Sequence, residues 1–167
     1  MLEKFAPDYY FHKFEEITPD FLIGKNIRAI VSDIDNTLVT YDDEKPTAKL
    51  LEWITALKEK GIAVSFVSNN TVKRVKVFNE ELRFFAVGKA KKPFKKNVLR
   101  ALEEMGVPSE NACMLGDQVF TDVFAGKGAN IRTILVDPIK DKTDILTKSK
   151  RVLEIPIIKA YRKSQSK

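Results

Sequence analysis

The chain has 167 residues, of which 44% are hydrophobic and 31% charged, and its formal net charge is +6. This length is typical of one domain and suffices to bury about 70% of the surface that the unfolded chain exposes. The single cysteine, Cys113, excludes an internal disulfide, and the single histidine, His12, gives poor support to a His-based metal site or a Ser-His catalytic pair.

The hydropathy of the chain predicts a cytoplasmic protein. No apolar run approaches the roughly 18 residues that a helix needs to cross a bilayer. Residues 1–5 lack the charged and then apolar layout of a signal peptide.

Short β-branched runs alternate with segments of helical spacing, which predicts an α/β fold with a mostly parallel sheet. The runs cover residues 27–33, 62–67, 84–87, 112–115 and 131–136. Apolar stripes between them predict helices over 50–57, 72–82 and 94–105, and a short fourth helix over about 121–126. In the third stripe Phe94 is the first apolar position, and Gly106 ends the helix.

We expect a single domain in three parts. Residues 1–26 are rich in aromatic side chains and predict a short helical arm packed onto the domain, residues 27–137 form the core, and residues 138–167 form a basic C-terminal segment. The net charge is +8 over residues 73–100 and +6 over residues 140–167, and the rest of the chain carries −8. A basic face toward an anionic substrate, lipid or nucleic acid is one interpretation, and a solvated lysine-rich surface is the other.

Two carboxylates, Asp33 and Asp35, lie at the end of the first β-branched run and are followed by Asn36 and Thr37. Two like charges held so close repel each other, and a divalent cation or a phosphoryl group would relieve the repulsion. A turn or a helix cap is the alternative interpretation of such a pair.

Three further motifs follow three later runs. They are Ser68-Asn69-Asn70, the lysines of Lys89-Ala90-Lys91-Lys92-Pro93, and Gly116-Asp117 with Asp122 five residues on. Each motif alone is weak, because Ser-Asn-Asn is also a good helix N-cap and Gly-Asp is common in turns. Ligands of parallel sheets bind beyond the carboxyl ends of the strands, so the four motifs are expected to meet at one site.

In order and residue type the four motifs resemble those of the haloacid dehalogenase (HAD) superfamily of phosphohydrolases, over about residues 27–137. The chain is most similar to the YqeG-type proteins of HAD subfamily IIIA, through Asp-Asn-Thr-Leu, Val-Ser-Asn-Asn, Gly-Asp-Gln-x-x-Thr-Asp and the N-terminal Phe-x-Pro-Asp and Ile-Thr-Pro stretches. The resemblance implies a HAD-like Rossmannoid three-layer sandwich and a phosphatase.

The resemblance also implies a role for each motif residue. Asp33 resembles the nucleophile that becomes an aspartyl phosphate, and Asp35 the general acid and then base. The residues expected at the phosphoryl group are Thr37, which would brace the loop, Ser68, the Asn69 backbone, and Lys92, with Lys91 as the alternative lysine. The cofactor is expected to be Mg²⁺, held by Asp33, the main-chain carbonyl of Asp35, and Asp117, with Asp122 supporting the site.

The spacing between the motifs predicts that the site has no cap domain. Thirty residues (38–67) separate Thr37 from Ser68, and twenty-three (69–91) separate Ser68 from Lys92. Each interval has room only for a helix, a strand and short loops. An open site suits a large substrate or a partner that supplies the lid. A basic rim would favour an acidic substrate and is formed by Lys73, Arg74, Lys89, Lys91, Lys95 and Lys96.

The leading substrate hypothesis is a phosphorylated lipid headgroup such as phosphatidylglycerophosphate, because YqeG-type proteins resemble phosphatases of that lipid. It includes peripheral contact with an anionic membrane. A phosphosugar, a phosphoprotein or a nucleic-acid end is an alternative substrate, and a non-catalytic binding or scaffold module is an alternative function. We do not expect a nucleic-acid partner, because the chain lacks the interleaved aromatic and basic residues of single-strand binders. The sequence leaves the oligomeric state open.

Overall fold

The computed structural model describes residues 5–140 and 145–165. Six parallel strands form one sheet in the order β1-β6-β5-β2-β3-β4. The strands are β1 (Tyr9–Phe11), β2 (Ala29–Ser32), β3 (Ala63–Val67), β4 (Ala86–Val87), β5 (Ala112–Gly116) and β6 (Arg132–Val136). The predicted α/β fold with a mostly parallel sheet is confirmed.

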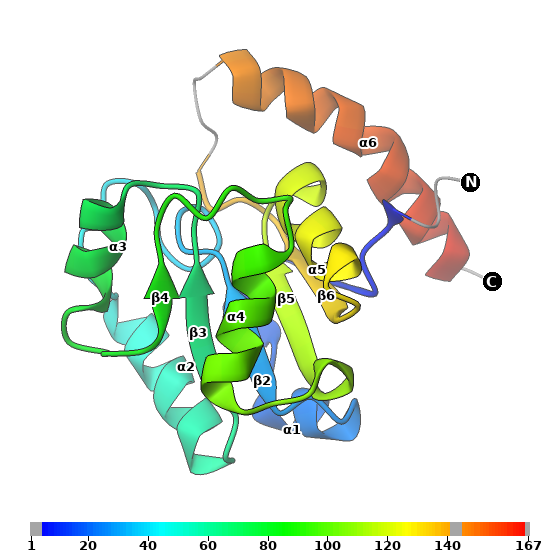
Figure 1. Ribbon diagram of the computed structural model, residues 1–167. Coiled ribbons are helices and arrows are strands. Elements are labelled where there is room, and N and C mark those ends of the chain that lie inside the picture. Colours follow the sequence, from blue (N-terminus) through cyan, green and yellow to red (C-terminus); the bar gives the residue numbers. More distant parts are fainter. Residues whose placement is uncertain (1–4, 141–144, 166–167) are drawn as a thin grey trace.

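Helices cover both faces of this sheet, as Figure 1 shows. The cluster of buried residues on one face includes residues of α1 (Pro19–Gly24), α2 (Ala48–Glu59) and α3 (Val72–Asn79). The cluster on the other face includes residues of α4 (Lys96–Met105) and α5 (Phe124–Gly128). The chain therefore forms the expected three-layer sandwich.

The helices of the core follow the predicted stripes, but α3 ends at Asn79, short of the predicted residue 82, and α4 begins later than predicted. The side chains of Leu50, Ile54 and Leu57 are buried along α2, and Gly106 ends α4 in the left-handed conformation with φ 65°. Phe94 was predicted as the first apolar position of the third helix, and this is wrong. The helix begins at Lys96, and the Phe94 side chain lies before it, 72% exposed.

The N-terminal segment differs from the helical arm that was predicted for it. Residues 1–26 were predicted as a helical arm, but Tyr9–Phe11 form the edge strand β1, which pairs in parallel with β6. A 3-10 turn (Phe14–Glu16) and α1 follow. Aromatic residues favour extended backbone where a pleated surface is available. The partner strand lies more than 120 residues away, so local spacing does not reveal it.

The basic C-terminal segment contributes a long helix, α6 (Ile145–Gln165), to which the sequence assigned no element. Its Ile157 side chain is buried against Val119, Val123 and Leu135. Of the helices within residues 5–140 and 145–165, none is long and apolar enough to cross a membrane.

Candidate active site

The strand order reverses between β2 and β5, and the chain places carboxylates at the carboxyl ends of both strands. Beyond β2 the Asp33 N–H donates to the Leu115 carbonyl at 2.9 Å, so the pairing with β5 extends to Asp33. The chain then turns at Asn36, whose φ is 64°, and the Asn36 N–H donates to the Val39 carbonyl at 2.7 Å. This tight turn keeps Asp33 and Asp35 buried at the end of the strand.

A buried lysine joins the first motif to the fourth. The Lys92 Nζ lies 3.0 Å from an Asp33 oxygen and 2.6 Å from an Asp122 oxygen, with 1% of its side chain exposed. The Lys92 N–H donates to the Asn69 side-chain oxygen at 2.7 Å, and the Asn69 amide donates back to the Lys92 carbonyl at 3.1 Å. The alternative lysine, Lys91, is exposed. The structure thus brings Lys92 to the carboxylates and leaves Lys91 outside.

Burial governs the charges of this group. Burial raises the pKa of Asp33 to about 6; the Lys92 ammonium opposes this rise and the Asp122 carboxylate adds to it. Burial also tends to lower the pKa of Lys92, but the attraction of Asp122 and Asp33 outweighs it, so that the pKa of Lys92 is raised. Lys92 is therefore a stable cation between two carboxylates.

Three carboxylates form a group suited to a cation. Asp33, Asp117 and Asp122 each offer an oxygen, and these oxygens lie within 4.8 Å of one another. The Thr37 hydroxyl donates to an Asp117 oxygen at 3.2 Å, and the Gln118 N–H donates to an Asp122 oxygen at 3.1 Å. A buried, all-oxygen donor set of this kind fits Mg²⁺, which is a hard cation.

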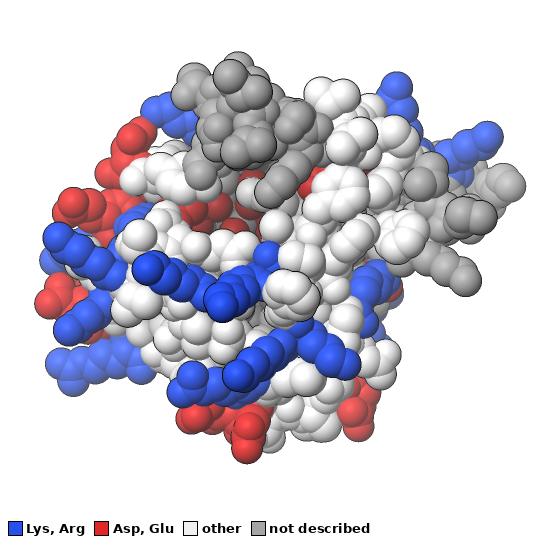
Figure 2. All heavy atoms as spheres, turned by 45° about the horizontal axis from the view of Figure 1, so that its top comes forward, with Lys and Arg blue, Asp and Glu red and all other residues white. Residues whose placement is uncertain are grey.

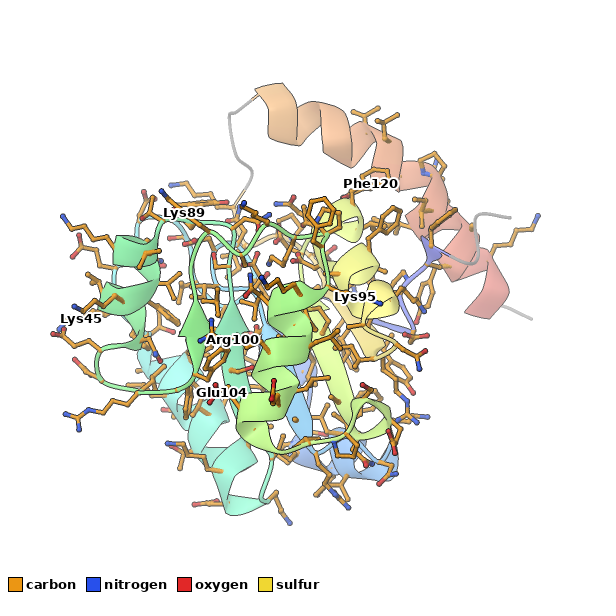
Figure 3. The ribbon with its side chains drawn as sticks, in the orientation of Figure 1. Lys45, Lys89, Lys95, Arg100, Glu104 and Phe120 are labelled. Atoms are coloured by element: carbon orange, nitrogen blue, oxygen red, sulfur yellow. The ribbon has the colours of Figure 1, made fainter. Side chains whose placement is uncertain are left out.

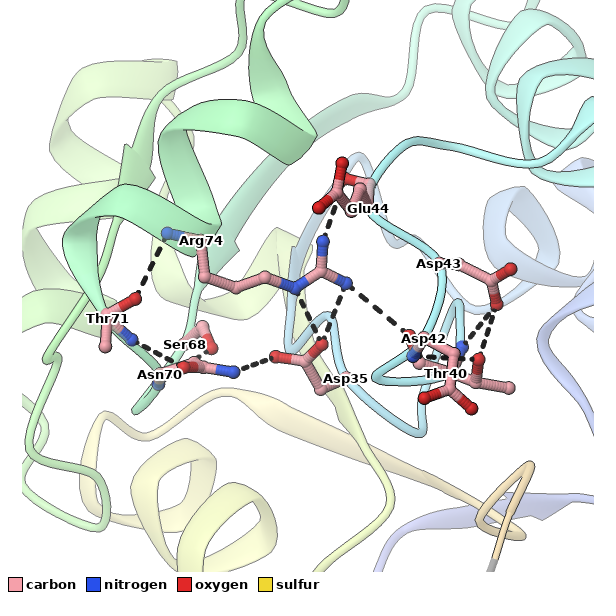
Figure 4. Close-up of polar contacts among 9 residues, drawn as sticks. All are labelled: Asp35, Thr40, Asp42, Asp43, Glu44, Ser68, Asn70, Thr71 and Arg74. Atoms are coloured by element: carbon pink, nitrogen blue, oxygen red, sulfur yellow. Dashed lines mark hydrogen bonds and ion pairs between the residues drawn. The ribbon is translucent and has the colours of Figure 1, made fainter.

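The Asp35 carboxylate is held by Asn70 and by Arg74 of α3 (Figure 4). The Asn70 amide donates to one oxygen at 2.8 Å, and the Arg74 guanidinium donates to the other at 2.9 and 3.1 Å. Arg74 was expected on the basic rim, and this is wrong, because its side chain is only 13% exposed and is paired with Asp35. A count of charges along the sequence does not distinguish an exposed arginine on the rim from an arginine that is paired with a buried carboxylate.

The second motif lies at the end of β3, next to the first. The Ser68 side chain is buried and its hydroxyl accepts a hydrogen bond from the Asn70 N–H at 3.1 Å. The Ser68 N–H donates to the Val87 carbonyl at 2.9 Å, which ties the motif to β4. All the residues predicted for the site thus lie at the carboxyl edge of the sheet.

Sequence reasoning did not single out Asn70 or Arg74 as partners of Asp35, nor did it single out Glu154. The Glu154 carboxylate, buried on α6, accepts a hydrogen bond at 3.1 Å from the Phe120 N–H, near the start of the π-helical turn Val119–Val123 that carries Asp122. Asn70 was part of a quoted motif, but Glu154 had no local signal because it lies 34 residues from its partner.

Gly116 leaves room for Asp122, and we expect Gly116→Ala to lower turnover by displacing that carboxylate. A Cβ at position 116 would overlap with the Asp122 side chain. Asp122 would then lose its 2.6 Å contact with Lys92. Activity assays and the free energy of unfolding measure the effect, and full turnover in Gly116→Ala would contradict it. Gly24→Ala is the matched control, because no atom lies within 4 Å of a Cβ there.

A three-layer sandwich with clustered carboxylates and a lysine at the carboxyl edge of its parallel sheet is the arrangement expected of a hydrolase of the HAD class. The model of the haloacid dehalogenase-like hydrolase family matches residues 30–88, and a HAD-hydrolase-like family model matches residues 89–153.

The "Probable phosphatase YqeG" of Bacillus subtilis (strain 168) is 39% identical over 164 residues, which cover 98% of this chain and 95% of that protein. The chain therefore belongs to the HAD-like hydrolases of this phosphatase family, and it is a phosphatase. The crystal structure of an uncharacterized protein from Corynebacterium glutamicum shares the fold, with a TM-score of 0.51 at 12% identity over 78% of this chain and 94% of that one.

Proposed function

We propose that the chain hydrolyses phosphate monoesters through an aspartyl phosphate on Asp33, with Mg²⁺ as its cofactor. The observation that carries the proposal is the buried group of Asp33, Lys92, Asp117 and Asp122 where the strand order reverses. In the first step an Asp33 oxygen attacks phosphorus, and Asp35 gives its proton to the leaving oxygen. In the second step Asp35 takes a proton from the water that attacks the aspartyl phosphate, which releases phosphate and restores Asp33.

The other motif residues would hold the transferring group. Ser68, the Asn69 backbone and Lys92 would bind the phosphoryl oxygens, and Thr37 would brace the loop through Asp117. Mg²⁺ would be held by Asp33, the Asp35 main-chain carbonyl and Asp117, with Asp122 in support. When bound, it supplies positive charge that offsets the repulsion between an anionic nucleophile and an anionic substrate.

Hydrolysis of p-nitrophenyl phosphate and a panel of phosphate esters tests this proposal. We expect activity with Mg²⁺, loss of activity with EDTA, and recovery when Mg²⁺ is restored in excess. A purified protein that hydrolyses no ester of the panel with Mg²⁺ would support the alternative, a binding or scaffold module on a HAD fold.

For the substrate, we propose a large anionic phosphate ester, such as phosphatidylglycerophosphate presented by an anionic membrane surface. In the described residues only α2 and β3 lie between Thr37 and Ser68, and only α3 and β4 between Ser68 and Lys92, so neither interval holds a cap domain. Figure 2 views the molecule with the carboxyl edge of the sheet turned toward the reader. It shows acidic side chains in a hollow, with a row of Lys and Arg side chains along the edge of this hollow.

The rim of the site combines positive charge with one exposed aromatic ring. Phe94 is 72% exposed and is flanked in sequence by three exposed lysines, Lys91, Lys95 and Lys96. In Figure 3, Lys89 and Lys95 lie toward the carboxyl edge of the sheet, whereas Arg100 and Glu104 lie farther along α4. An exposed ring among cations suits a surface that is anionic outside and apolar beneath.

We expect reversal of charge on this rim to affect a lipid substrate more than a small ester. The double variant Lys95→Glu/Lys96→Glu should lose activity on phosphatidylglycerophosphate in anionic micelles by about 10-fold or more, since each surface cation contributes about 1 kcal/mol of attraction. Its activity on p-nitrophenyl phosphate should change far less.

A matched control reverses charge at the opposite edge of the sheet. Lys25→Glu/Lys60→Glu changes the net charge equally, at the carboxyl ends of α1 and α2 where the chain enters β2 and β3. It should act on both substrates as the native protein does. Equal losses on lipid and aryl substrate for the Lys95/Lys96 variant would remove the rim from substrate recognition.

A further inference from the structure

Arg74 forms a forked contact with one oxygen of Asp35. Its Nε and one terminal nitrogen lie 3.1 and 2.9 Å from the Oδ1 atom, and the two side chains are 13% and 4% exposed. The contact crosses 39 residues of sequence and joins α3 to the loop beyond β2. A guanidinium in this position is a permanent cation with a rigid set of donors, so it fixes direction as well as charge.

The remaining donors of Arg74 reach the loop that follows the first motif. One terminal nitrogen donates to the Glu44 carbonyl at 2.8 Å, and the other also lies 3.5 Å from the Thr40 carbonyl. This loop is braced internally, because the Thr40 N–H and hydroxyl both donate to an Asp43 oxygen, at 2.9 and 2.7 Å. One side chain thus ties Asp35, α3 and the loop of residues 40–44 together, as Figure 4 shows.

The second Asp35 oxygen is also held by a hydrogen bond. It accepts a hydrogen bond from the Asn70 amide at 2.8 Å, and Asn70 is itself oriented by the Thr71 N–H, which donates to its side-chain oxygen at 2.7 Å. With a donor on each oxygen, the rotation of the carboxylate is restricted. A displacement of about 1 Å in a catalytic group can cost roughly 10²-fold in rate.

We propose that Arg74 is a positioning residue, which aims the Asp35 carboxylate and couples it to the loop of residues 40–44. This inference rests on the acid–base role proposed above for Asp35. Removal of Arg74 therefore impairs proton transfer to the leaving oxygen, and its cost grows as the leaving group becomes a stronger base.

Two aryl esters of similar size test the proposal. p-Nitrophenyl phosphate has a leaving group that needs little protonation, whereas the leaving group of phenyl phosphate is a much stronger base. We expect Arg74→Met to lower kcat/KM for phenyl phosphate by about 10²-fold and for p-nitrophenyl phosphate by much less. Guanidinium ion, added well below denaturing concentrations, should restore part of the lost rate. Lys76→Met is the matched control, since it removes an exposed cation from the same helix and should alter neither ester.

Arg74→Lys keeps the charge but loses the fork, and it should show a smaller loss with the same dependence on leaving group. It carries the test if Arg74→Met does not fold. Equal losses on both esters in the folded variant, without rescue by guanidinium, would overturn the positioning role.

Asp35→Asn, measured in parallel, separates this inference from the proposed function. A leaving-group dependence in Asp35→Asn that is missing in the Arg74 variants defeats the Arg74 inference alone. Its absence in Asp35→Asn defeats the acid role, and the inference falls with it.

Discussion

Asp33→Asn is expected to lower turnover of p-nitrophenyl phosphate by about 10⁴-fold or more, because an amide cannot replace the attacking carboxylate oxygen. The change is nearly isosteric, and the Asp33 N–H that pairs with Leu115 is kept. Circular dichroism should therefore show an unchanged fold. Activity within 10-fold of the native rate would contradict the assignment of Asp33 as nucleophile.

The same variant has an expected signature in stability. Burial raises the pKa of Asp33 to about 6, so the ionised carboxylate is less favourable in the folded chain than in the unfolded one. The stability that Asp33 contributes is thus fully present below about pH 4, the usual pKa of Asp, and is lost as the pH rises through about 6. Urea unfolding without metal should show that the native protein loses stability relative to Asp33→Asn over this range. No difference in slope would contradict it.

Lys92→Met is expected to reduce both stability and activity. The Lys92 ammonium is buried between Asp33 and Asp122, and its loss leaves two buried carboxylates without their shared cation. Removing one partner of a buried ion pair costs about 3–5 kcal/mol. Urea unfolding measures this cost in stability. Phosphatase assays should show a loss of turnover that corresponds to at least the same free energy.

Mg²⁺ and a neighbouring lysine provide the controls. A divalent cation should raise the melting temperature of Lys92→Met more than that of the native protein, because the acidic group has lost its internal counter-charge. Lys91→Met, which alters the exposed lysine one residue earlier, should change the free energy of unfolding by no more than about 0.5 kcal/mol. A large cost for Lys91→Met and a small one for Lys92→Met would reverse the assignment of the two lysines.

The core strands were predictable because each lies in a short apolar run that is followed by polar residues. β2 and β5 are examples, since all their residues are buried and a motif carboxylate comes directly after the last residue of each. The edge strand β1 was missed, because its three residues are only half-buried and owe their extended form to β6. Phe94 was misassigned for a related reason: apolar character at helical spacing does not reveal where a helix begins.

The sequence by itself determined the order of the motifs, their places at the ends of apolar runs, and intervals too short for a cap. These features are local, because they depend on side-chain periodicity and on chain length. Only the tertiary structure decided which polar groups meet. It paired Lys92 with Asp33 and Asp122, and Arg74 with Asp35, across 30 residues or more. Such partners depend on how α3 and the loop before α4 pack against the sheet. The spacing of residues along the chain does not encode how these segments are oriented on the sheet.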